Sequence, residues 1–172
     1  ERAGGAPHGP DGPVYPGICR DLSSDECAER IAGGAAWAIR LDMARAVDAT
    51  GPLFWTERDR GEIAADPARF GDVVLARKDT PTSYHLAVTI DDALQGVTLV
   101  TRGEDLAPAT DIHRLLQALL ALPVPEWTHH PLLTDENGKR YAKRDRSLTL
   151  RALREAGKTP EGLREMIGQS LV

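Results

Sequence analysis

The chain has 172 residues and a formal net charge of -5, which suits one domain with a hydrophobic core. This charge argues against a protein that coats nucleic acid by bulk electrostatics, although a local basic patch is compatible with it. No apolar run approaches the roughly 20 residues that a membrane-spanning helix needs, so we expect no membrane association. Two cysteines, Cys19 and Cys27, are too few for a disulfide framework and favour a reducing cytoplasm.

The N-terminal segment mixes helix breakers with short regular elements. Residues 1–20 are rich in Gly and Pro and cannot sustain a regular element. Ser23 or Ser24, followed by acidic residues, predicts the capping box of a helix that ends at the glycines 33–34. Residues 35–43 then predict a strand.

The middle of the chain has the composition of short strands. Residues 51–79 hold two strand-like runs around a turn at residues 66–67. Residues 83–94 and 96–103 predict two further strands that are joined by a short connection.

The clearest helix is predicted at residues 108–122, where Thr110 or Asp111 can cap the first turn. Prolines at positions 123 and 125 end it. Apolar side chains at helical spacing form one stripe, which consists of Ile112, Leu115, Leu116, Leu119 and Leu120.

The C-terminal part predicts a strand, a turn and two helices. Residues 126–134 are the strand, and Asn137-Gly138 is typical of a hairpin-like turn. A helix over residues 147–157 closes at its final glycine, and a last helix follows Thr159. Strands interleaved with helices predict an α/β sheet with parallel strands, whose ligands lie at the carboxyl ends.

Three motifs, in order along the chain, carry a resemblance to a known family. "GKRYAKRD" at residues 138–145 resembles the second signature (KMSKS) loop of class I aminoacyl-tRNA synthetases. Residues 83–106 are similar to the segment before that loop in glutamyl-tRNA synthetases. "VYPGICR" at residues 14–20 resembles the zinc-binding insertion of one paralogous group, the glutamyl-queuosine tRNA(Asp) synthetases.

The resemblance implies a Rossmann-type α/β class I synthetase catalytic domain that lacks its N-terminal nucleotide-binding half. Residues 1–34 would be the rest of the zinc-binding insertion and a linker helix. Residues 35–172 would be the C-terminal half of the catalytic domain, with the signature loop.

The resemblance also implies the site residues. The family's glutamate-binding tyrosine and arginine fall on Tyr84 and Arg102. The lysine that contacts ATP phosphates falls on Lys143, and Arg140 stands in for the first lysine of the loop. The implied cofactors are ATP with Mg²⁺ and a zinc ion.

Of the zinc ligands, Tyr15 and Cys19 match the family pattern, but its Cys-x-Cys pair and the HIGH nucleotide-binding motif are absent. No signal peptide is visible and the first residue is Glu1, so we expect the missing motifs upstream. In the signature loop, residues 140–142 read Arg-Tyr-Ala where the family has Lys, a hydrophobic residue and Ser.

The residue types alone also support binding of glutamate and ATP at these positions. A guanidinium such as that of Arg102 binds a carboxylate through two hydrogen bonds, which a lysine cannot reproduce. Tyr84 can donate its hydroxyl to the same substrate. Cations of the loop around Lys143 can stabilise the negative charge that builds on ATP phosphates when glutamate is activated.

Each residue also has a simpler interpretation. The basic loop is compatible with a solvated surface, Arg102 with a surface ion pair, and Tyr84 with an ordinary strand aromatic. Two ligands cannot close a zinc site, which leaves Cys19 as a free thiol or a half-site. The acidic pair at residues 91–92 invites a catalytic dyad, but a turn with a capping role is favoured.

The predicted function is ATP-dependent activation of glutamate and its transfer to the queuosine base in the anticodon loop of tRNA(Asp). The chain continues only 27 residues beyond Asp145, which favours the short paralogue over an enzyme with an anticodon-binding domain. Alternatives are a fragment of a discriminating glutamyl-tRNA synthetase that charges tRNA(Glu), or a non-catalytic RNA-binding module. We expect a cytoplasmic monomer, and we expect the 172-residue chain alone to be inactive.

Overall fold

The computed structural model describes residues 8–10, 12–132, 149–166 and 168. Contacts within the chain define two units, Glu1–His130 and Pro131–Val172. The expected boundary after residue 34 stays a prediction. None of the helices in the described ranges is long and apolar enough to span a membrane.

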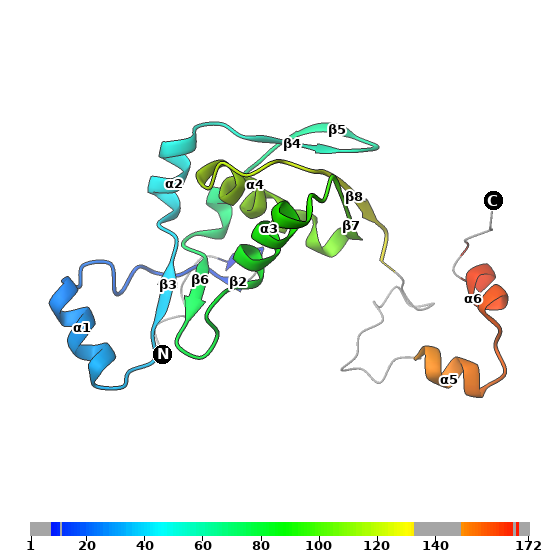
Figure 1. Ribbon diagram of the computed structural model, residues 1–172, viewed down its shortest axis with the longest axis horizontal. Helices are drawn as coiled ribbons and strands as arrows, with labels where there is room; N and C mark the ends of the chain where they lie inside the picture. Colours follow the sequence, from blue (N-terminus) through cyan, green and yellow to red (C-terminus); the bar gives the residue numbers. More distant parts are fainter. Residues whose placement is uncertain (1–7, 11, 133–148, 167, 169–172) are drawn as a thin grey trace. The chain divides into compact units, whose positions relative to one another are not determined.

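The first unit is built on a four-stranded sheet in the order β5-β4-β8-β7 (Figure 1). Strand β4 (Phe54–Glu57) pairs with β5 (Gly61–Ala64) in the antiparallel sense and with β8 (Glu126–His130) in the parallel sense. Strand β7 (Leu99–Gly103) is parallel to β8. The predicted parallel pairing is thus confirmed for three strands.

Two smaller sheets complete the strands of this unit. Strand β3 (Ala38–Arg40) pairs with β6 (Val74–Arg77), and β1 (His8–Gly9) pairs with β2 (Gly12–Pro13), both in the antiparallel sense. A 3₁₀ turn, η2 (Pro67–Phe70), occupies the turn that was predicted between strand-like runs.

Helix α1 (Ser24–Ala32) begins with the predicted capping box. The Ser23 side chain accepts a hydrogen bond from the Glu26 backbone N–H, and the Glu26 carboxylate accepts one from the Ser23 backbone. Helix α2 (Met43–Thr50) is capped by Asp42, so the strand that was predicted for residues 35–43 is only three residues long.

The segment predicted as a strand over residues 83–94 is wrong, because it forms helix α3 (Tyr84–Gln95). Ser83 caps this helix by accepting a hydrogen bond from the Leu86 backbone, and Gly96 ends it in the left-handed conformation. These local signals and the packing of α3 against α4 override the β-branched composition. The acidic pair at residues 91–92 therefore lies within a helix and not in a turn.

Helix α4 (Thr110–Leu119) confirms the strongest helix prediction, and it follows a 3₁₀ segment, η3 (Glu104–Ala109). Neither predicted cap acts as one, because the N-cap residue is Ala109 and makes no side-chain cap. Asp111 instead accepts a hydrogen bond from the Trp55 indole at 3.0 Å and pairs with Arg69.

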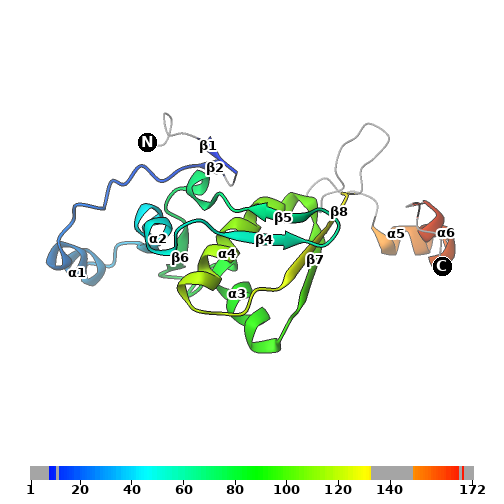
Figure 2. The same cartoon turned by 90° about the horizontal axis from the view of Figure 1, so that it is seen from above.

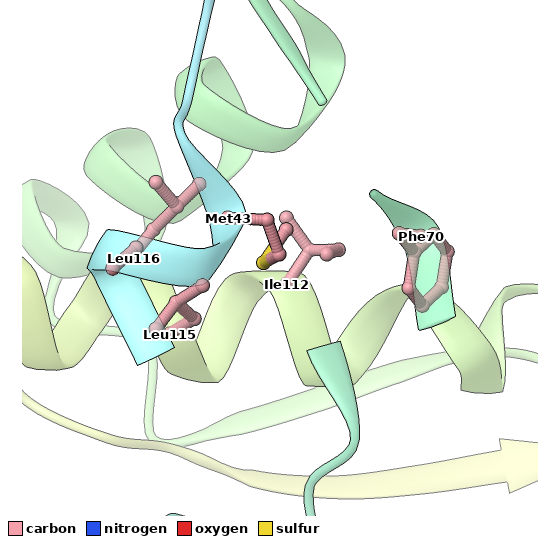
Figure 3. Close-up of a cluster of buried hydrophobic side chains, with 6 residues drawn as sticks. Met43, Phe70, Ile112, Leu115 and Leu116 are labelled. Atoms are coloured by element: carbon pink, nitrogen blue, oxygen red, sulfur yellow. The ribbon is translucent and has the colours of Figure 1, made fainter. Parts of the chain in front are cut away.

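Helices α2 and α4 lie next to each other (Figure 2), and the core packs against the face of α4 that meets α2 (Figure 3). Ile112 and Leu115 of the predicted stripe are fully buried, whereas Leu119 and Leu120 are exposed. Figure 3 shows the cluster around them, which consists of Met43, Phe70, Ile112, Leu115 and Leu116 with Ala46. Burial of each large side chain contributes about 1.5–3 kcal/mol, which holds α2, η2 and α4 together.

The second unit contains the two predicted C-terminal helices, α5 (Leu150–Glu155) and α6 (Pro160–Met166). Thr149 caps α5 by accepting a hydrogen bond from the Ala152 backbone. Gly157 follows α5 with a φ of 76°, as the closing-glycine prediction requires. The predicted turn at Asn137-Gly138 lies outside the described residues.

Candidate functional site

Three polar side chains meet where the parallel strands β4, β7 and β8 end. Glu57 is the last residue of β4, and Arg102 and His129 are next to last in β7 and β8. Arg102 and His129 are direct partners in the parallel register. Carboxyl ends of parallel strands are the usual position of a ligand site in an α/β sheet.

Arg102 lies inside this group, with only 9% of its surface exposed. Its Nε donates to His129 Nε2 at 3.1 Å, its Nη1 contacts His113 Nδ1 at 3.1 Å, and its Nη2 donates to the Thr110 hydroxyl. Burial lowers the pKa of the Arg102 guanidinium, while nearby Tyr84, Asp92 and Glu57 act in the opposite direction. The interpretation of Arg102 as a surface ion-pairing residue is therefore wrong.

These contacts fix the protonation of both imidazoles, because a guanidinium has hydrogen-bond donors and no acceptor. His129 Nε2 must accept from Arg102, so its proton is on Nδ1, which lies 2.6 Å from Glu57 Oε2. His113 Nδ1 must likewise accept, so its Nε2–H points to His85 Nδ1 at 3.2 Å. Both rings are neutral in this arrangement.

Glu57 anchors the far end of the network. Its carboxylate accepts from the His129 backbone N–H at 2.7 Å as well as from the His129 ring. Burial raises the pKa of the Glu57 carboxyl, but the two hydrogen bonds from His129, together with the electrostatic effects of His129 and Arg60, bring it below its ordinary value. The Glu57 carboxyl is therefore ionised at neutral pH. The residue is only 4% exposed, and each of its two oxygens accepts a hydrogen bond from His129.

Tyr84 begins α3 at the edge of the same group. Its ring meets His85 and His113 edge to face, at centroid distances of 5.5 and 5.6 Å. Half of the residue, 51%, is exposed, and it lines a cleft of about 440 Å³ together with Arg40 and Asp72. The structure thus brings Tyr84 and Arg102 together, as the family resemblance implies.

Asp92 is the second acidic group that faces this site, from the third turn of α3. Burial raises the pKa of its carboxyl, Arg102 lowers it in part, and neighbouring Asp91 raises it. Among residues 8–10, 12–132 and 149–166, no carboxylate forms an ion pair with Arg102. Of the acidic pair, Asp92 acts on Arg102 by electrostatic attraction.

Tyr15 and Cys19 also lie together, and Tyr15 lines the same cleft as Tyr84. The Tyr15 hydroxyl accepts a hydrogen bond from the Cys19 backbone N–H at 2.8 Å, and the Arg40 guanidinium lies 4.2 Å from the Tyr15 ring centroid. Burial, followed by the hydrogen bond with the Cys19 side chain, raises the pKa of Tyr15. Within the described ranges no group of three or more His, Cys, Asp or Glu side chains is arranged to hold a metal.

Lys143 and Arg140, the predicted ATP-binding residues, lie outside the described residues. Sequence reasoning missed Glu57, Thr110 and His113 as neighbours of Arg102. Glu57 is 72 residues from His129, so no local motif connects them. The sequence did contain two relevant histidines. His113 lies near the start of the predicted helix at residues 108–122, and His129 lies in the predicted strand at residues 126–134.

Comparison with known proteins agrees with this arrangement. The family model described as "tRNA synthetases class I (E and Q), catalytic domain" matches residues 6–170. The chain belongs to this family of class I synthetase catalytic domains, which confirms the predicted fold class.

Individual relatives refine the comparison. The glutamyl-Q tRNA(Asp) synthetase of Rhodobacter capsulatus is 49% identical over 95% of this chain and 59% of its own length. The glutamate–tRNA ligase of Aquifex aeolicus is 36% identical over 87% of this chain and 31% of its own. The chain therefore spans little more than half of the first of these relatives.

A solved structure has the same fold. The glutamate tRNA ligase from Elizabethkingia meningosepticum, solved in complex with its amino acid, superposes with a TM-score of 0.60 at 27% identity. The similarity covers 77% of this chain and 27% of that protein.

The first prediction concerns the neutral state of His113. Burial, helped by Arg102 and His85, lowers the pKa of His113 to about 3, against about 6.5 in an unfolded chain. The folded state then binds fewer protons, so the stability that His113 confers is present above pH 6.5 and is lost as the pH falls. Between pH 6.5 and 4.5 this loss is roughly 2 kcal/mol in the free energy of unfolding.

Chemical denaturation across this pH range measures the effect. His113→Asn keeps an acceptor for Arg102 without a titrating ring, so its stability should fall less steeply than that of the parent. The difference between the two slopes reports on His113 together with any change at His85, whose Nδ1 lies 3.2 Å from His113 Nε2. Equal slopes for parent and variant would show that His113 is protonated in the folded state.

Proposed function

We propose that the protein activates glutamate with ATP and transfers it to the queuosine base in the anticodon loop of tRNA(Asp). One observation carries the proposal: a buried arginine, Arg102, lies with its donors at the carboxyl ends of three parallel strands, beside Tyr84. The names of the relatives supply the substrates, and the chain represents part of their length. The activity is therefore proposed for the intact protein.

Arg102 binds the side-chain carboxylate of glutamate in this proposal. The contacts to His113 and Thr110 use one N–H of each terminal nitrogen, and the second N–H of each can donate to the substrate carboxylate beside the Tyr84 hydroxyl, which is itself within hydrogen-bonding reach of Arg102. Two parallel N–H donors match the two oxygens of a carboxylate, and a charge-assisted pair of this kind is stronger than a neutral hydrogen bond. Tyr84 closes one side of the substrate and donates its hydroxyl.

ATP, with Mg²⁺, is the second substrate. Lys143 neutralises charge on the ATP phosphates as the adenylate forms and pyrophosphate leaves, and Arg140 assists from the first position of the loop. Support comes from the position of these cations in a segment that matches the family.

The most specific part of the proposal is the group of the tRNA that accepts glutamate. The identity to a glutamyl-Q tRNA(Asp) synthetase, 49%, exceeds the 36% identity to a glutamate–tRNA ligase. This difference favours the queuosine base of tRNA(Asp) over the end of tRNA(Glu). We place the reaction in the cytoplasm and in a monomer, because Cys19 and Cys27 form no disulfide and the buried part of the α4 stripe packs inside the unit.

A zinc ion is proposed at Tyr15 and Cys19, with two further ligands outside this sequence. The hydroxyl of Tyr15 lies within hydrogen-bonding reach of the Cys19 side chain, so two of the four donors of a tetrahedral site are already adjacent. The ion would have a structural role, and no step of the reaction depends on it.

The glutamate prediction is tested with Arg102→Lys in the intact protein. The lysine keeps the charge but loses the paired donors, so the Michaelis constant for glutamate should rise about tenfold or more, in line with about 1.5–3 kcal/mol for a charge-assisted bond. Glutamate-dependent pyrophosphate exchange measures it. Arg58→Lys is the matched control, because Arg58 is exposed and pairs only with Glu126 among the described side chains. An unchanged glutamate dependence in Arg102→Lys would remove Arg102 from the site.

The signature-loop prediction is tested with Lys143→Ala in the same assay. A charge that acts mainly in the transition state affects turnover more than ATP binding. Turnover should therefore fall by about two to three orders of magnitude, as for the loss of one well-placed donor. If Lys139→Ala has this effect and Lys143→Ala does not, the alignment of the loop is wrong. If neither matters, the loop is a solvated surface.

The zinc prediction is tested by elemental analysis of the purified intact protein. We expect about one zinc per chain, and a strong loss in Cys19→Ala. Cys27→Ala is the matched control, because Cys27 lines the same cleft as Cys19 but has no proposed metal role. Zinc retained in Cys19→Ala, or absent from the parent, would contradict the proposed site.

A further inference from the structure

We infer that Glu57, acting through His129, is a positioning and specificity residue that holds Arg102 ready for a side-chain carboxylate and against a carboxamide. The inference rests on the proposed function, in which Arg102 binds glutamate. It adds two residues, on different strands, to which no role has been assigned.

The first step is geometric. Glu57 accepts two hydrogen bonds from His129, one from its backbone and one from its ring, at 2.7 and 2.6 Å. The ring is thereby fixed in position and tautomer, and its other nitrogen accepts from Arg102 Nε. Glu57 and His129 are both buried, so water does not compete for these contacts. The direction of the guanidinium plane thus depends on Glu57.

The second step concerns charge. A protein carboxylate in direct contact with Arg102 would use the paired donors that a substrate carboxylate needs. Here the side chains that contact the guanidinium are those of His129, His113, Thr110 and Tyr84, and none of them is a carboxylate. The Glu57 carboxylate lies on the far side of the His129 imidazole and offsets the buried positive charge of Arg102 from there. The carboxylate of the substrate can therefore be the first one that contacts the guanidinium.

The third step is selectivity. A glutamate side chain offers two charged acceptors to the terminal nitrogens of Arg102. A glutamine side chain offers one acceptor and one NH₂ donor, and that donor would face the N–H groups of a guanidinium whose orientation is fixed. A polar group left unpaired in a buried site is costly, so a rigid Arg102 discriminates better than a mobile one.

Glu57→Gln separates this role from simple packing, because the shape is almost unchanged. The two N–H groups of His129 meet different oxygens of Glu57, and the amide has an NH₂ donor in place of one of these oxygens. Either the backbone bond is lost, or the ring switches tautomer and turns Nε2–H toward Arg102 Nε–H, a donor against a donor. In either case the fixed orientation of Arg102 is lost.

The experiment is steady-state pyrophosphate exchange with the intact protein, with glutamate or glutamine as the amino acid. In Glu57→Gln we expect the Michaelis constant for glutamate to rise about tenfold or more, while that for ATP stays within about twofold. The preference for glutamate over glutamine should fall by a similar factor. Glu126→Gln, the same change at an exposed carboxylate on the neighbouring strand β8, should match the parent.

Combination with Arg102→Lys distinguishes the two possible failures. If Arg102→Lys leaves the glutamate dependence unchanged, the proposed function of Arg102 fails. If Arg102→Lys raises it and Glu57→Gln does not, only the positioning role is overturned. When Glu57 acts through Arg102, the double variant should be little worse than Arg102→Lys alone.

A loss of folding must also be separated from a loss of positioning. Circular dichroism and thermal unfolding report the fold of each variant. If Glu57→Gln does not fold, His129→Gln is used, since its amide oxygen can still accept from Arg102 without the ring that Glu57 fixes. A glutamate-specific rise in this variant supports the inference, and parent-like values for both amino acids overturn it.

Discussion

The parallel register of β4, β8 and β7 is the constraint on which the rest of the site depends. It makes Arg102 and His129 direct neighbours and pairs Glu57 with Trp127, two residues before His129. Trp127 is almost fully buried and meets Trp55 of β4 edge to face at 5.8 Å. A slip of one residue would turn each of these side chains to the opposite face of the sheet, so the packing of the two tryptophans and the polar network are fixed together.

The network also explains how a buried cation is tolerated. An isolated charge in a protein interior is unfavourable by several kcal/mol, and a direct ion pair often only compensates for this loss. In this unit the charge of Arg102 is spread over hydrogen bonds to two imidazoles and a hydroxyl, and a carboxylate lies one ring away. Such a network is stable only when each member is satisfied, and it therefore specifies one arrangement of side chains.

The sequence predicted elements whose signals are local, such as α4 from the spacing of Ile112 and Leu115, and β7 and β8 from their composition. It did not predict the partners of Arg102, because Glu57 and His113 reach it through strand register and helix packing that span the chain. The acidic residues that follow Arg102 left a surface ion pair open as the simpler alternative to a substrate-binding role. Burial reversed that interpretation, since the strand that carries Arg102 turns it inward.

The largest error of the sequence analysis, a strand in place of α3, has a functional consequence. In a strand, Tyr84 and His85 would point to opposite faces, and an aromatic could line a ligand only alone. In a helix both rings lie within 5.6 Å of His113, and Asp92, two turns later, faces the same arginine. The helix therefore lets one segment supply the side wall of the site and a long-range negative charge, whereas in a strand Tyr84 and Asp92 would lie roughly 26 Å apart.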